Sequence, residues 1–135
     1  MKLGDPYRTV KFSEQSMMVV RSAISRTDLK WNEGILHNSN NKSRKSEVAW
    51  VKDSRLLSML FSMAQQMNVA AGWNLKLSGI EPVQFGVYSE SDRYDWHVDQ
   101  HNKSNKGMVR KISMSLFLNE DYEGGDFDLE IYKPE

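Results

Sequence analysis

The chain of 135 residues contains no cysteine, and this absence excludes several kinds of site. Without thiols there can be no disulfide framework, no zinc–thiolate centre and no cysteine nucleophile. Disulfides are rare in reducing compartments, so the composition fits a cytoplasmic protein. A chain of this length suits one domain and can bury a hydrophobic core without covalent staples.

Long apolar runs and an excess of one charge are also missing. The N-terminal segment MKLGDPYRTVKF lacks the apolar stretch of a signal peptide, and no segment reaches the roughly eighteen apolar residues of a membrane span. Lys plus Arg number 18 and Asp plus Glu number 18. This balance gives no general attraction to nucleic acid or to an anionic membrane. We interpret the local basic cluster at Lys42, Arg44 and Lys45 as a solvated loop.

The first half of the sequence has helical periodicity in two places. Apolar residues at helical spacing predict a helix over 13–25, with Ser13 as its N-cap. A second amphipathic helix is predicted to begin after Asp53 or Ser54 and to end at Gly72. The polar segment 27–45 between them predicts a loop, for which Trp31 is one candidate anchor to the core.

After Gly72 the pattern changes to the alternation that is typical of strands. The predicted strands cover 74–88 (as one or two strands), 94–99, 109–118 and 126–132. A turn that ends in Gly124-Gly125 separates the last two. Helices followed by antiparallel-type strands indicate an α+β fold. We therefore predict a single domain over 1–135, in which 1–72 is mainly helical support and 73–135 forms the sheet.

One short motif, His97-Val-Asp99, carries the chemistry. Residues two apart on an extended strand point to the same face, so an imidazole and a carboxylate would lie side by side. These are two of the three ligands in the two-histidine, one-carboxylate site of non-haem Fe(II) oxygenases. The same motif also arises by chance, as a histidine and an aspartate hydrogen-bonded on a strand.

The sequence around this motif resembles the prolyl 4-hydroxylase and PKHD-type family of Fe(II)- and 2-oxoglutarate-dependent oxygenases. Four motifs occur in the family's order, namely EPVQFGVY at 81–88, YDWHVD at 94–99, RKISMSLFLN at 110–119 and YEGGDF at 122–127. The resemblance implies a double-stranded β-helix (jelly-roll, cupin-like) behind N-terminal helices. It also implies Fe(II), 2-oxoglutarate as cosubstrate, and ascorbate as a further candidate cofactor.

The resemblance assigns roles residue by residue. His97 and Asp99 match two iron ligands and would be catalytic. Tyr88 matches a tyrosine that contacts 2-oxoglutarate. Phe117 stands where several relatives have a tyrosine that reaches the distal carboxylate of the cosubstrate, and a phenyl ring cannot donate that hydrogen bond. Ser113 and Ser115 are candidates to replace the missing hydroxyl.

The family's third iron ligand, a histidine beyond the Gly-Gly strand, has no counterpart in the sequence, and neither has the Lys or Arg that comes after it. The other two histidines are His37, in a polar loop, and His101, in the polar stretch after the motif. We therefore expect a β-helix that is incomplete at its C-terminus, in an N-terminal or truncated portion of a longer protein. An open sheet would need a partner or self-association to cover it.

The sequence leaves several functions open. One is a dioxygenase that hydroxylates a peptidyl residue, with proline as the first candidate and a peptide or protein as substrate. The alternative is a non-catalytic peptide- or protein-binding module on the same fold, because the third ligand and the tyrosine are missing. A nucleobase substrate finds no support in the neutral charge.

Overall fold

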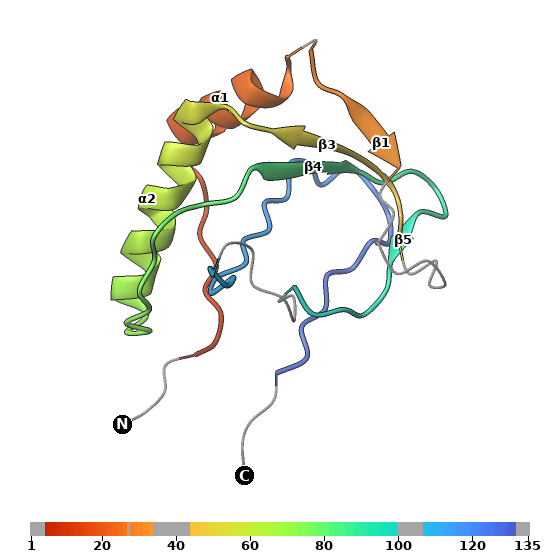
Figure 1. Ribbon diagram of the computed structural model, residues 1–135. Helices are drawn as coiled ribbons and strands as arrows, with labels where there is room; N and C mark the ends of the chain where they lie inside the picture. The colour runs from red at the N-terminus through yellow and green to blue at the C-terminus, as the bar shows by residue number, and fades with distance from the viewer. Residues whose placement is uncertain (1–4, 27, 34–43, 100–106, 132–135) are drawn as a thin grey trace.

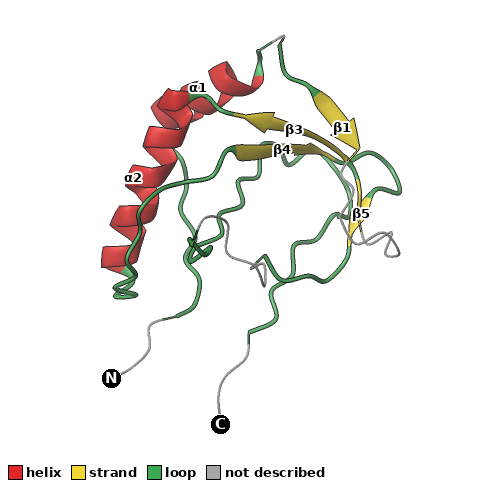
Figure 2. Ribbon diagram, viewed as in Figure 1, coloured by secondary structure: helices red, strands yellow, loops and turns green. Residues whose placement is uncertain are grey.

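The computed structural model describes residues 5–26, 28–33, 44–99 and 107–131. The elements are α1 (Glu14–Ile24), β1 (Trp31–Glu33), β2 (Arg44–Lys45), β3 (Glu47–Val51), α2 (Ser54–Ala70), β4 (Val83–Val87) and β5 (Arg93–Tyr94), as drawn in Figures 1 and 2. All strand pairs are antiparallel. This mixture of helices and antiparallel sheet confirms the α+β prediction. In the described part of the chain, neither helix is long and apolar enough to cross a bilayer.

Both helices form where the sequence predicts them, because side chains cap their first turns. The hydroxyl of Ser13 accepts a hydrogen bond from the Ser16 N–H at 3.1 Å, and the carboxylate of Asp53 accepts one from the Leu56 N–H at 2.9 Å. Each cap satisfies a backbone donor that has no partner inside the helix. Gly72, just after α2, has a φ of +68°, the left-handed conformation that ends helices.

The hydrophobic core lies between the two helices and the end of the sheet that adjoins them (Figure 1). Its buried members are Val20 and Ala23 from α1, Val51 from β3, and Leu56 and Leu60 from α2. Half-buried Val83 and Phe85 of β4 and Leu116 pack against this cluster. The core therefore joins segments from both halves of the sequence.

The larger sheet has three strands in the order β1-β3-β4, with β3 in the middle. Ala49 of β3 pairs with Trp31 on one side and with Phe85 on the other, and it is fully buried. The two aromatic rings are 5.1 Å apart between centroids, so they approach each other across this small side chain. Aromatic contacts between strands stabilise sheets, and this one links the two outer strands, β1 and β4, across β3.

The first half contributes strands as well as helices, which the sequence pattern did not predict. The predicted loop over 27–45 is wrong at its described ends, where β1 and β2 form. Strand β3 was not predicted, because Val48 and Ala49 are both buried and the period-two pattern is lost. Short polar strands depend on the hydrogen bonds of their neighbours more than on local preference, so β1 and β2 exist only because β3 and β5 pair with them.

A double-stranded β-helix is not formed by the described residues. The predicted strands over 109–118 and 126–132 form no ladder in the described range 107–131, and a segment becomes a strand only when a neighbour pairs with it. The chain bends at Glu123 between them, and Gly124 and Gly125 have φ of +71° and +66°. Phe117 and Phe127 meet across this bend edge to face, with centroids 5.6 Å apart.

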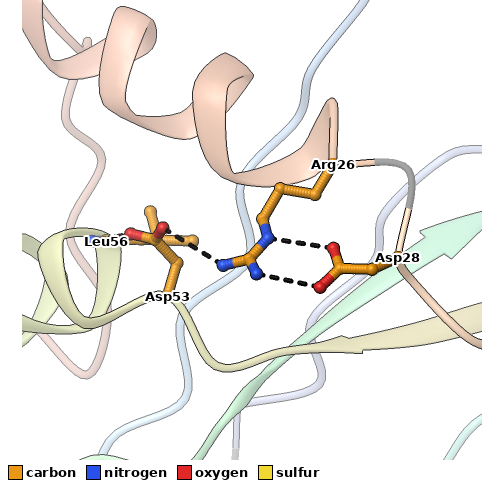
Figure 3. Close-up of polar contacts among 4 residues, drawn as sticks. All are labelled: Arg26, Asp28, Asp53 and Leu56. Atoms are coloured by element: carbon orange, nitrogen blue, oxygen red, sulfur yellow. Dashed lines mark hydrogen bonds and ion pairs between the residues drawn. The ribbon is translucent and has the colours of Figure 1, made fainter.

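Two polar contacts fix the ends of α2. At its start, Arg26 lies between Asp28 and Asp53 (Figure 3), with Nε and Nη2 3.0 and 2.9 Å from the Asp28 carboxylate and Nη1 4.0 Å from Asp53. At its end, the buried Asn68 amide donates to the Leu75 carbonyl at 2.8 Å and accepts from the Leu75 N–H at 2.9 Å. These contacts set how the chain enters and leaves the helix.

Candidate metal site

The His97–Asp99 motif lies just after β5, not within a strand. The predicted strand over 94–99 is limited to Arg93–Tyr94, which pairs with Arg44–Lys45 of β2. A turn at 89–92 precedes it, in which the Asp92 N–H donates to the Ser89 carbonyl at 3.0 Å and the Asp92 carboxylate accepts from the Ser89 N–H at 2.8 Å. The two side chains meet nevertheless, so local turns and contacts replace the strand geometry that the motif predicted.

The two side chains face each other closely. Nε2 of His97 lies 3.0 Å from Oδ1 of Asp99, and the side chains are 31% and 51% exposed. Two adjacent ligand atoms on an octahedral cation, each about 2.1 Å from it, are about 3.0 Å apart. The observed separation therefore fits two neighbouring positions on one metal ion.

The other nitrogen of His97 also has the arrangement of a metal ligand. Nδ1 lies 2.8 Å from the backbone carbonyl of Asp95, which can only accept a hydrogen bond. The proton therefore belongs on Nδ1, and the lone pair of the neutral ring is on Nε2, facing Asp99. Histidines that bind metals commonly donate their second ring nitrogen to a carbonyl in this way.

A lone pair and a carboxylate oxygen 3.0 Å apart repel unless a positive charge lies between them. Either a proton on Nε2 or a metal cation removes this repulsion. The first gives an imidazolium–carboxylate ion pair, and the second gives two ligands of a metal site. Titration of the chain with a divalent cation distinguishes these two states.

Two neighbouring side chains, those of Tyr94 and Arg110, hold the motif in place. The sequence pattern did not indicate this role for either residue. The ring of Tyr94 stacks on the His97 imidazole, with centroids 3.5 Å apart and 13° between the planes. Arg110 donates from Nη1 to the backbone carbonyl of Asp99 at 2.9 Å. Tyr94 stands three residues before His97 in the sequence. The stacking of the two rings, however, depends on how the chain bends at Trp96, which the sequence pattern did not predict.

Arg110 is itself fixed by Glu81. Its Nε donates to Oε2 of Glu81 and its Nη2 donates to Oε1 at 3.0 Å, a side-on bidentate pair. This hydrogen bonding to Glu81, together with the negative charges of Glu81 and Asp99, raises the pKa of Arg110 above its usual value. The guanidinium is therefore charged and oriented by one carboxylate while its third nitrogen reaches the ligand segment.

Three residues are predicted to contact 2-oxoglutarate. In the described part of the chain, no strand brings them together around His97. Tyr88 comes directly after β4 and is 48% exposed. Ser113 and Ser115 are exposed, and Ile112 and Leu116 in the same segment are half-buried. Their assignment to the cosubstrate stays a prediction.

A third ligand is not found among the residues that the structure describes, where no group of three or more His, Cys, Asp or Glu could hold a metal. His37 and His101 lie outside the described residues. Comparison with protein-family models, with curated proteins and with solved structures gave no match for this chain. The candidate site therefore rests on the geometry around His97 and Asp99.

Proposed function

We propose that this chain carries part of the iron site of an Fe(II)- and 2-oxoglutarate-dependent dioxygenase that hydroxylates a peptidyl residue, with proline as the first candidate. The observation that carries the proposal is the 3.0 Å approach of His97 Nε2 to Asp99 Oδ1, with Nδ1 directed to a carbonyl. The order of the four motifs over 81–127 supports the same family. We also propose that the complete protein site has the double-stranded β-helix of that family as its fold.

In this proposal each residue near the motif has a defined task. His97 would bind the metal through Nε2 and Asp99 through Oδ1. The Asp95 carbonyl keeps the proton on Nδ1, and the Tyr94 ring limits rotation of the imidazole. When bound, iron with 2-oxoglutarate and O2 supplies the oxidising chemistry that converts a C–H bond to an alcohol. The remaining protein ligand would come from a residue outside the described set.

A binding module without catalysis is the second candidate, favoured by the absence of a three-residue metal group among the described residues. In that case His97 and Asp99 form an imidazolium–carboxylate ion pair. Phe117, which packs against Phe127, then has a purely apolar role. The two candidates differ in whether a divalent cation binds at Asp99.

The test is a titration of the chain with Fe(II) under anaerobic conditions, with Mn(II) as an oxygen-stable probe, in the presence of 2-oxoglutarate. Asp99→Asn and Asp95→Asn are a matched pair, because each removes one carboxylate from the same short segment. Asp95 contributes its backbone carbonyl, which the substitution keeps. We expect Asp99→Asn and His97→Ala to weaken metal binding more than tenfold and Asp95→Asn to leave it unchanged.

Turnover is then measured as Fe(II)-dependent formation of succinate from 2-oxoglutarate, with and without proline-containing peptides. The dioxygenase predicts succinate with the native sequence and a loss of it in Asp99→Asn. No metal binding, or binding that Asp99→Asn does not change, would overturn the proposal. Saturable peptide binding without metal would then identify the binding module.

A further inference from the structure

We propose that Glu81 and Arg110 form a positioning pair that holds the metal-binding segment at Asp99, an inference that rests on the proposed function. The Arg110 side chain hydrogen-bonds the backbone carbonyl of Asp99 at 2.9 Å. Its other two nitrogen positions are engaged by Glu81. The pair therefore connects the ligand segment to a part of the chain 29 residues away from Arg110.

Glu81 is a firm attachment point because it stands directly before Pro82 and strand β4. Proline restricts the residue before it to extended conformations, and β4 begins at Val83. β4 pairs with β3 over five residues, from Val51↔Val83 to Glu47↔Val87. Because Val51 belongs to the buried core and pairs with Val83, Glu81 lies two residues before a part of the sheet that is anchored in the core.

The ligand segment has no comparable support of its own. Strand β5 ends at Tyr94, and residues 95–99 form no ladder with a neighbouring strand in the described part of the chain. Contacts in this segment include the Arg93–Asp95 ion pair, the contact of His97 with the Asp95 carbonyl, the Tyr94 stack and the Arg110 hydrogen bond. Of these four, the Arg110 bond connects the segment to a residue outside 93–99.

The pair stabilises the fold as well as holding Asp99. Exposed ion pairs contribute little to folding, but a bidentate arginine–carboxylate contact, here with side chains 35% and 54% exposed, is an exception. The planar fork of arginine can bind a carboxylate with two nitrogens and still offer a third, which a lysine ammonium cannot do in the same geometry. This three-way geometry is suited to orienting Asp99.

The experiment measures Mn(II) affinity and thermal unfolding side by side in Arg110→Ala, Arg110→Lys and Glu81→Gln. The control is Arg21→Ala, which removes an exposed ion pair with Glu14 on α1. Loss of an outer partner of a metal ligand typically weakens binding about 10–100-fold, which we expect for Arg110→Ala. We expect partial losses for Glu81→Gln and Arg110→Lys, and no change for Arg21→Ala.

Exchanging the two charges distinguishes the positioning of Asp99 by Arg110 from the stabilising effect of the Glu81–Arg110 ion pair. The double variant Glu81→Arg/Arg110→Glu restores opposite charges, but a carboxylate at position 110 has no hydrogen to donate to the Asp99 carbonyl. The positioning role predicts that the swap regains the melting temperature without regaining metal affinity. If the swap regains both, or if Arg110→Ala binds Mn(II) within twofold of the native chain, the inference is overturned. Should Asp99→Asn also keep native affinity, it is the proposed function that fails.

Discussion

The imidazole of His97 and the carboxylate of Asp99 face each other across 3.0 Å, although neither residue lies in a strand. The contact is local in sequence, but it is maintained by groups on three segments. Tyr94 covers the imidazole ring, and Arg110 and Glu81 connect Asp99 to the sheet. These supports, and the helices that carry the sheet, can each be tested by substitution.

The tautomer of His97 gives a direct prediction. With Zn(II) as a diamagnetic probe, we expect Nδ1 to keep its proton and Nε2 to be the nitrogen whose 15N resonance moves, because the Asp95 carbonyl accepts from Nδ1 at 2.8 Å. Long-range 1H–15N correlation spectra of the imidazole measure this. Movement of Nδ1 with a protonated Nε2 would contradict the geometry.

The stacked ring of Tyr94 should contribute to metal binding through its shape. We expect Tyr94→Ala to lower Mn(II) affinity roughly fivefold, since an aromatic contact is worth about 1 kcal/mol beyond its buried area. Tyr94→Phe keeps the ring and should bind like the native chain. Equal losses in both variants would assign the effect to the hydroxyl instead.

The buried amide of Asn68 should be important for folding. Asn68→Ala removes two hydrogen bonds and leaves the N–H and carbonyl of Leu75 without this partner, so we expect a loss of about 2–3 kcal/mol in the free energy of unfolding. Urea denaturation measures it. Asn68→Asp retains the acceptor and loses the donor, and it should also destabilise the chain. A change below about 0.5 kcal/mol in both variants would show that water replaces the amide without penalty.

The N-cap of α2 can be separated from the ion pair at the same residue. Asp53→Ala should cost about 1 kcal/mol, because the Leu56 N–H loses its acceptor. Asp53→Asn keeps a capping oxygen but removes the charge that faces Arg26 at 4.0 Å, and an ion pair at this long distance contributes little. In urea denaturation, the free energy of unfolding of Asp53→Asn should therefore be close to that of the native chain, and that of Asp53→Ala should be well below it. The opposite ranking would make the ion pair the important contact.

The Arg26–Asp28 pair should make the free energy of unfolding depend on pH in the acidic range. The hydrogen bonds and positive charge of Arg26 hold the pKa of Asp28 below its usual value of 3.8. A carboxyl with a lowered pKa in the folded state stabilises that state above its unfolded pKa, and the contribution is lost as the pH falls through the folded value. The urea midpoints of the native chain and Asp28→Asn should therefore differ at neutral pH and converge below pH 3.8. Because both side chains are exposed, the difference should be small.

The sequence by itself determined the helices and the identity of the motif residues. Apolar spacing, Ser13, Asp53 and Gly72 are local signals, and local signals suffice where the hydrogen bonds of an element are made within it. The positive φ angles of Gly124 and Gly125 belong to the same class, because glycine adopts this conformation without a steric penalty. The sequence also predicted that His97 and Asp99 would lie side by side, but on a strand that ends before them.

Only the tertiary structure decided which extended segments become strands and what holds the motif. The polar segments at Trp31–Glu33 and Arg44–Lys45 are strands because β3 and β5 pair with them. The strongly alternating segment 109–118 forms none, because no neighbour in the described range supplies a ladder. The Glu81–Arg110–Asp99 connection likewise joins residues far apart in the chain. Hydrogen bonds between distant segments depend on where the core brings those segments, and local residue patterns do not encode that placement.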